Sequence, residues 1–179
     1  MCIRDRRRIR HAGLRERVVS ADQAASLIRD GMVLGMSGFT RAGEAKAVPM
    51  ALAERAKRAP MKVTLMTGAS LGNDLDKTMA EAHLLSRRIP FMSDPALRRA
   101  INAGEVMYID QHLSETVEQL RTCQLPPVDI AIVEAVAITE TGGIVPTTSV
   151  GNSASFALLA EKVIAVSYTH LTLPTSDLV

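Results

Sequence analysis

Short apolar segments alternate with longer stretches of helical periodicity along this chain, and that alternation constrains the fold more than any other feature. The apolar segments are too short for buried helices and are typical of strands, whereas the stretches between them repeat apolar residues every three or four positions. Strands that are joined by helices pair in parallel through right-handed crossovers. We therefore predict an α/β fold with an open, mostly parallel sheet flanked by helices. The predicted strands are residues 32–37, 62–66, 106–110, 128–133 and 162–166.

Local signals mark the ends of the predicted helices. Ser20 and Gln23 have the spacing of a capping box, in which two side chains satisfy free backbone amides at a helix start. Ser93 or Asp94 can cap another helix. Two β-prone arms around a Gly-Gly pair predict a hairpin over residues 137–145. The predicted helices are residues 21–30, 46–58, a stretch that contains Leu75, Met79 and His83, a segment closing at Gly104, and residues 114–123 and 155–161.

The 179 residues, of which 47% are hydrophobic, are enough for one domain with an ordinary core. The two ends differ from the rest, because residues 1–7 and 167–179 resemble translated sequencing-adapter sequence. We expect the first segment to be adapter-derived or disordered and the last to be an adapter-derived tail. The predicted domain is therefore residues 8–166.

Charge and composition argue against several classes of function. The 21 basic residues nearly balance the 19 acidic ones, and Trp is absent, so neither a basic surface nor a stacking platform for nucleic acid is expected. Cys2 and Cys123 are too isolated for a disulfide framework or a metal site. The longest apolar run is interrupted by Glu134 and is too short to span a membrane. We expect a soluble, cytoplasmic protein that binds neither nucleic acid nor membrane.

Three loops that follow predicted strands combine glycine with hydroxyl side chains. In a parallel sheet, ligands bind beyond the carboxyl ends of the strands, where free backbone amides point outward. None of the loops has the Gly-Lys-Ser/Thr of a phosphate-binding loop or a full dinucleotide fingerprint. Each loop is therefore either a ligand contact or only a tight turn with a helix cap. The loops are residues 37–43, 67–72 and 147–153.

Isolated polar residues are weaker candidates. Glu134 ends an apolar strand, so it is a possible general base or nucleophile, or else a strand-end carboxylate paired with an Arg or a backbone amide. His83 is interpreted as a packed or surface residue and His112 as part of a turn. No cluster in the sequence has the spacing of metal ligands.

Several motifs taken together resemble the acetyl-CoA hydrolase/transferase family. They are Ser-Gly-Phe-Thr-Arg-Ala-Gly at 37–43, Lys-Ala-Val-Pro at 46–49, Thr-Gly-Ala-Ser at 67–70, Ser-Asp at 93–94, Ile-Asn-Ala-Gly at 101–104, and the fifteen-residue run at 139–153. The resemblance covers nearly all of residues 15–166. It implies the amino-terminal domain of a longer enzyme that moves CoA between small acids such as acetate, succinate and propionate, or hydrolyses acetyl-CoA. The implied fold is the CoA-transferase type, which sugar-phosphate isomerases share.

The resemblance implies a ping-pong reaction through a glutamyl-CoA thioester, whose glutamate lies in a second half that this sequence does not contain. No catalytic residue is therefore assigned here, and the fragment alone is expected to be inactive. No metal or permanently bound cofactor is implied, and the coenzyme A thioester is a substrate. The expected partners are small carboxylic acids, the missing domain and, in the full-length enzyme, a second copy in a homodimer.

The resemblance also implies which residues line the substrate pocket. Arg41 and Glu44 place charges where family members often have small or aromatic residues, which leaves the accepted acid open. Two alternatives with the same general architecture are a sugar-phosphate isomerase and a ligand-sensing domain, and the long 139–153 motif argues against the first. The implied substrate-binding residues are Gly38, Phe39, Ser70, Ser93, Thr147, Gly151 and Asn152.

Overall fold

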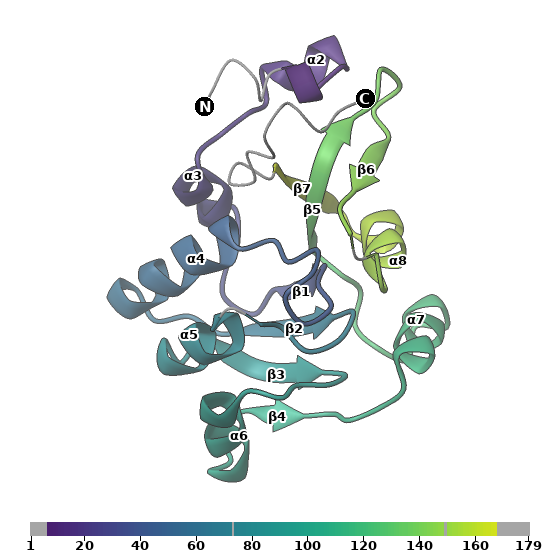
Figure 1. The fold of residues 1–179 in the computed structure, drawn as a ribbon. Coiled ribbons are helices and arrows are strands. Elements are labelled where there is room, and N and C mark those ends of the chain that lie inside the picture. The colour runs from purple at the N-terminus through teal and green to yellow at the C-terminus, as the bar shows by residue number, and fades with distance from the viewer. Residues whose placement is uncertain (1–6, 73, 149, 168–179) are drawn as a thin grey trace.

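A computed structural model describes residues 7–72, 74–148 and 150–167 of the chain. A central sheet carries helices on both sides (Figure 1), with strand order β4-β3-β2-β1-β5-β6 and β7 paired to β5. Every strand pair is parallel except β5–β6, so the predicted α/β fold with a mostly parallel sheet is confirmed. The strands are β1 (Val33–Met36), β2 (Val63–Thr67), β3 (Leu85–Ile89), β4 (Met107–Tyr108), β5 (Ile130–Ile138), β6 (Ile144–Pro146) and β7 (Lys162–Ser167).

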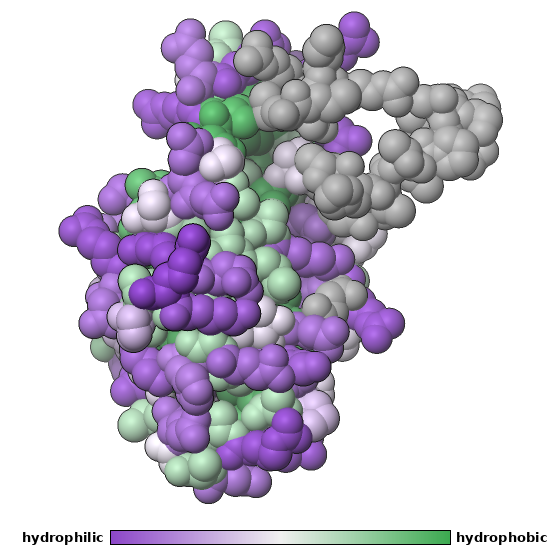
Figure 2. Space-filling view, turned by 90° about the vertical axis from the view of Figure 1, so that its left-hand side faces the viewer, coloured by the Kyte–Doolittle hydropathy of each residue, from purple (hydrophilic) through white to green (hydrophobic). Residues whose placement is uncertain are grey.

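The helices divide between the two faces of the sheet. In Figure 1, α3 to α6 lie on one side and α7 and α8 on the other. Each side has its own buried apolar cluster, the larger under α3 to α6 and the smaller around Phe156 and Leu120. Figure 2 shows that the outer surface on the α3–α6 side is mostly polar. The helices are α2 (Ala12–Arg15), α3 (Ala21–Ser26), α4 (Ala47–Arg58), α5 (Leu75–Glu81), α6 (Pro95–Asn102), α7 (Leu113–Arg121) and α8 (Ser153–Leu159).

The helix starts follow the sequence signals. The predicted capping box at α3 is present, because Ser20 accepts a hydrogen bond from the Gln23 amide and Gln23 accepts one from the Ser20 amide. Asp94, not Ser93, caps α6, where its carboxylate accepts from the amides of Ala96 and Leu97 at 2.8 and 2.9 Å. The capping carboxylate fixes where the chain turns out of the sheet into α6.

Gly35 allows α8 to pack directly on the sheet. A Cβ at this position would lie 2.7 Å from Cγ of Phe156, which is fully buried. Only glycine leaves room for the aromatic ring at this point of β1, so the position of α8 depends on the absence of one side chain.

The sequence prediction missed β3. The helical stretch predicted through His83 ends at Glu81, His83 has a left-handed φ of 50°, and β3 follows directly. The strand was hidden by its two adjacent arginines, Arg87 and Arg88, the second of which is fully buried.

Two further boundaries concern β5 and the ends of the described residues. The strand predicted at 128–133 begins at Ile130 and continues to Ile138, where it forms the predicted hairpin with β6. Of the predicted end segments 1–7 and 167–179, only Arg7 and Ser167 lie inside the described residues, and Ser167 is the last residue of β7.

Candidate active site

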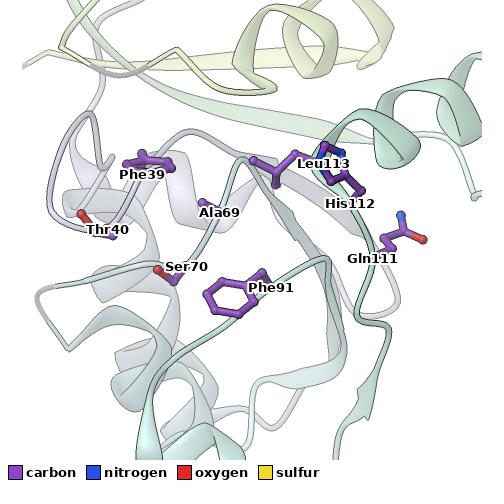
Figure 3. A pocket seen from close by; sticks show the side chains of 8 residues that line it. All are labelled: Phe39, Thr40, Ala69, Ser70, Phe91, Gln111, His112 and Leu113. Atoms are coloured by element: carbon purple, nitrogen blue, oxygen red, sulfur yellow. The ribbon is translucent and has the colours of Figure 1, made fainter.

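A pocket of about 340 Å³ lies beyond the carboxyl ends of the four parallel strands β1 to β4. Each strand contributes the residues that follow it, as parallel sheets commonly arrange their ligand sites. Figure 3 shows Phe39 and Leu113 along one side and the ring of Phe91 along the opposite side. The volume is in the range of small-molecule sites. The lining residues are Phe39, Thr40, Ala69, Ser70, Phe91, Gln111, His112 and Leu113.

The loops after β1 and β2 form one wall of the pocket. The Thr40 amide donates to the Ser70 carbonyl at 2.8 Å, which joins the two loops at the pocket. The buried carboxylate of Glu44 accepts from the Gly72 amide at 2.6 Å, which joins them again at their far end. The hydroxyl of Ser70 has no hydrogen-bond partner among the described residues, so it can donate to a ligand.

A buried ion pair lies directly beneath this wall. Arg88 and Asp76 are 0% and 1% exposed, and their side chains make two hydrogen bonds, from Nε to Oδ1 at 3.0 Å and from Nη2 to Oδ2 at 3.2 Å. Arg88 also donates to the Thr67 hydroxyl, to the Ala69 carbonyl and to the Ile89 carbonyl. The guanidinium therefore contacts the backbone of a pocket-lining loop at Ala69 and the end of β3 at Ile89, two residues before Phe91.

A second polar cluster connects β1, β5 and the loop after β6. The Thr147 hydroxyl donates to the buried carboxylate of Glu134 at 2.7 Å. The Glu134 amide donates to the Ser37 hydroxyl, which donates to the Gly43 carbonyl. Glu134 therefore lies in the middle of β5 and not at the end of a strand. Its carboxylate is held by a threonine hydroxyl, where the sequence suggested an arginine or a backbone amide.

Glycines let the loop after β2 lie close to both the loop after β1 and the loop after β6. A Cβ on Gly68 would lie 3.1 Å from the Gly38 carbonyl oxygen, 3.3 Å from the Asn152 amide nitrogen and 3.4 Å from Cα of Gly151. Asn152 also joins the loop after β6 to the segment after β4, because its Nδ2 donates to the carbonyl of Leu113 at 3.2 Å. The pocket residue Leu113 is therefore fixed from the loop that follows β6.

The structure brings some of the predicted site residues to the pocket and places others away from it. Phe39 and Ser70 line the pocket, and Gly38, Gly151 and Asn152 lie where the three loops meet. Thr147 is half-buried and its hydroxyl binds Glu134, whereas Ser93 is exposed and directly precedes Asp94, the cap of α6. Neither is among the pocket-lining residues. Whether these seven residues contact substrate stays a prediction.

The sequence interpretation passed over several pocket residues. Gln111, His112 and Leu113 follow β4 and could have been found by the same rule that selected the other loops, but only His112 was considered, as part of a turn. His112 instead caps α7, with its Nδ1 2.8 Å from the Ser114 hydroxyl. Phe91 could not be found, because it follows β3, which the sequence did not reveal.

Burial raises the pKa of Tyr108, which lies on β4 next to Arg88 in the sheet. Within residues 7–72, 74–148 and 150–167, no group of three or more His, Cys, Asp or Glu side chains could hold a metal ion.

In the same part of the chain, no helix is both long and apolar enough to cross a membrane.

The fold and the pocket define a domain of the α/β class with a pocket of small-molecule size at the carboxyl edge of a parallel sheet. The chain is 15% identical to the putative alfa subunit of citrate lyase from Streptococcus mutans, solved with citrate, with a TM-score of 0.65 over 88% of this chain and 32% of that one. At 13% identity and a TM-score of 0.55, it also resembles an acyl-CoA transferase of E. coli O157:H7, over 86% of this chain and 43% of that one. These likenesses show the fold.

Sequence comparison gives the family. The model of the acetyl-CoA hydrolase/transferase N-terminal domain matches residues 1–174, and the chain belongs to that family. It is 47% identical to the succinyl-CoA:acetate CoA-transferase of Clostridium kluyveri over 88% of this chain and 30% of that protein. It is 36% identical to the acetyl-CoA hydrolase of Schizosaccharomyces pombe over 88% of this chain and 32% of that protein. The chain therefore spans about a third of the length of these relatives.

Proposed function

We propose that this chain is the amino-terminal part of an acyl-CoA:carboxylate CoA-transferase or acetyl-CoA hydrolase, and that its pocket receives the small acid. The observation that carries the proposal is the composition of the pocket at the carboxyl edge. The hydroxyls of Thr40 and Ser70 lie beside the apolar side chains of Phe39 and Phe91. A short carboxylic acid has the matching chemistry, a carboxylate that accepts hydrogen bonds and a carbon chain that favours an apolar surface.

The proposed substrates are acyl-CoA and acids of the acetate, succinate and propionate class. Gly38, Phe39 and Ser70 would form the wall against the acid, with Ser93 at its outer end. Thr147, Gly151 and Asn152 would hold the loop that closes this wall from the side of β5. Three contacts support this division of roles: Thr147 binds Glu134 on β5, Gly151 lies against Gly68 after β2, and Asn152 binds the carbonyl of Leu113.

The proposed reaction uses a carboxylate nucleophile that we place in the remaining part of the enzyme. A glutamate in the remaining part of the enzyme would attack the acyl-CoA carbonyl, forming an acyl-glutamyl anhydride and releasing the CoA thiolate. The thiolate would then attack the glutamyl carbonyl, which releases the first acid and leaves a glutamyl-CoA thioester. An incoming carboxylate, or water in a hydrolase, would resolve this thioester. The CoA thioester is a substrate in this scheme, and no permanently bound cofactor takes part.

The proposed partner of this domain is the rest of the enzyme. Large apolar side chains are exposed on the last elements, most of all Leu158 on α8, which is 83% exposed. Exposed apolar side chains of this kind are typical of a surface that packs against protein. In the full-length enzyme we propose a homodimer located in the cytoplasm. The other exposed apolar residues of this region are Val136, Val145, Val150, Leu159 and Val163.

The test is CoA transfer by the full-length protein. The full-length gene would be recovered from the DNA that encodes this chain. Its product would be assayed with acetyl-CoA plus succinate and with acetyl-CoA in water. We expect succinyl-CoA or free CoA to form, and no turnover by the 179-residue chain alone. A full-length protein that neither transfers CoA nor hydrolyses acetyl-CoA would refute the proposal, and activity in the 179-residue chain would refute the location of the nucleophile.

A further inference from the structure

Arg88 stands out among the charged residues that the structure describes, because its side chain is completely buried and all its N–H donors form hydrogen bonds. A guanidinium has five N–H donors in a rigid planar arrangement. All five are taken, two by Asp76 and the other three by the Thr67 hydroxyl and the carbonyls of Ala69 and Ile89. Burial of an ion pair costs desolvation free energy, so a pair of this kind is weak evidence for stability by itself.

The partners of the pair lead directly to the pocket. Ala69 lines the pocket and precedes Ser70, whereas Ile89 is two residues before Phe91, which lines it from the other side. Asp76 adds a contact to the same loop, since Oδ2 accepts from the Leu71 amide at 3.3 Å. The pair therefore holds the backbone on both sides of the Ser70 hydroxyl and on the segment that carries Phe91.

We propose that Arg88 and Asp76 are positioning residues, which set the distance between the Ser70 loop and the Phe91 segment and so fix the width of the pocket. Neither side chain lines the pocket, so each acts through the backbone that it holds. The role in substrate binding rests on the function proposed above, whereas the role in fixing the loops does not.

The first test measures amide hydrogen exchange in the 179-residue chain with the variant Arg88→Lys. Lysine keeps the charge, but its three donors on a single nitrogen cannot replace a planar fork that holds Asp76 and two loops together. We expect the Leu71 and Thr40 amides to exchange at least about tenfold faster, with less than about a twofold change in β1 and β5. The matched control is Arg87→Lys on the same strand, because the Arg87 side chain takes no part in this network.

Two outcomes would overturn the proposal. One is unchanged exchange at Leu71 and Thr40, and the other is an equal acceleration in β1 and β5, which is the mark of a general loss of stability. If Arg88→Lys does not fold, the double variant Arg88→Met with Asp76→Leu replaces the pair by apolar side chains, an exchange that is often neutral for stability. The same selective acceleration is expected there, and full protection of the loop would overturn the proposal.

The second test uses the full-length enzyme. Arg88→Lys is expected to raise KM for the acceptor acid about tenfold with less than about a threefold change in kcat, because a displaced wall weakens binding of the acid itself. If the unaltered enzyme does not move CoA, the proposed function fails while the exchange experiment still decides the positioning role. If it moves CoA and Arg88→Lys matches Arg87→Lys in KM and in exchange, the positioning role fails and the function stands.

Discussion

Gly68 and Gly151 lie in contact across the top of the sheet, and a Cβ on Gly151 would be only 3.3 Å from Cα of Gly68. One glycine follows β2 and the other precedes α8, so segments more than eighty residues apart meet through their backbones. This contact brings the loop after β6 against the loop that carries Ser70.

Gly68→Ala should therefore destabilise the chain and separate the two loops. The added methyl group would meet three backbone atoms within 3.4 Å, and overpacking of this kind costs about 1–3 kcal/mol of unfolding free energy. Urea unfolding measures the change. Gly13→Ala in α2 is the matched control, because its Cβ would have only an ordinary contact with His11. Equal unfolding free energies for Gly68→Ala and the unaltered chain would contradict the expectation.

Thr147→Val should cost about 1–3 kcal/mol, because it removes the hydroxyl that donates to the buried Glu134 carboxylate. Thr147→Ser keeps that hydroxyl and should cost clearly less. A double-mutant cycle with Glu134→Gln measures the coupling between the two side chains, and we expect about 0.5–3 kcal/mol. The hydrogen bond would contribute nothing if valine and serine were equally destabilising, or if the coupling were zero.

Tyr108 is expected to make the unfolding free energy depend on pH in alkaline solution. Burial raises the pKa of the phenol above its ordinary value of 10.0, so the folded chain favours the neutral form. The resulting stability is fully present below about pH 10 and is lost as the pH rises through the pKa of the folded chain. Tyr108→Phe removes this titration, so its unfolding free energy should fall less steeply above about pH 10 than that of the unaltered chain. Parallel slopes in urea unfolding across this range would contradict the expectation.

Much of the fold could be predicted because local signals and tertiary structure agree. Apolar runs such as 128–133 became central strands, and the capping box of Ser20 and Gln23 formed as its spacing indicates. The sequence failed at β3, where Arg87 and Arg88 interrupt a strand. Charged residues are rarely fully buried without a partner. The partner, Asp76, lies twelve residues earlier, so no local pattern reveals the pair.

The site could be predicted in part, because some of its residues follow strands that local sequence signals reveal. Phe39 and Ser70 follow strands that the sequence shows clearly, and they line the pocket. The residues that hold the pocket were less visible, because a buried hydrogen bond such as Thr147 to Glu134 joins side chains whose proximity only the folded chain creates. Spacing along the sequence finds loops at the carboxyl edge, but it does not show which of them meet.

The hydrogen bond from Asn152 to the Leu113 carbonyl has a consequence for biosynthesis. Every residue that lines the pocket lies between Phe39 and Leu113, yet the side chain that fixes Leu113 belongs to the start of α8. At about 5–20 residues per second, a ribosome needs about 2–8 s to add the intervening segment. A nascent chain that has already formed β1 to β4 therefore holds all the lining residues during that interval, but it lacks the hydrogen bond that fixes Leu113 until Asn152 has been added.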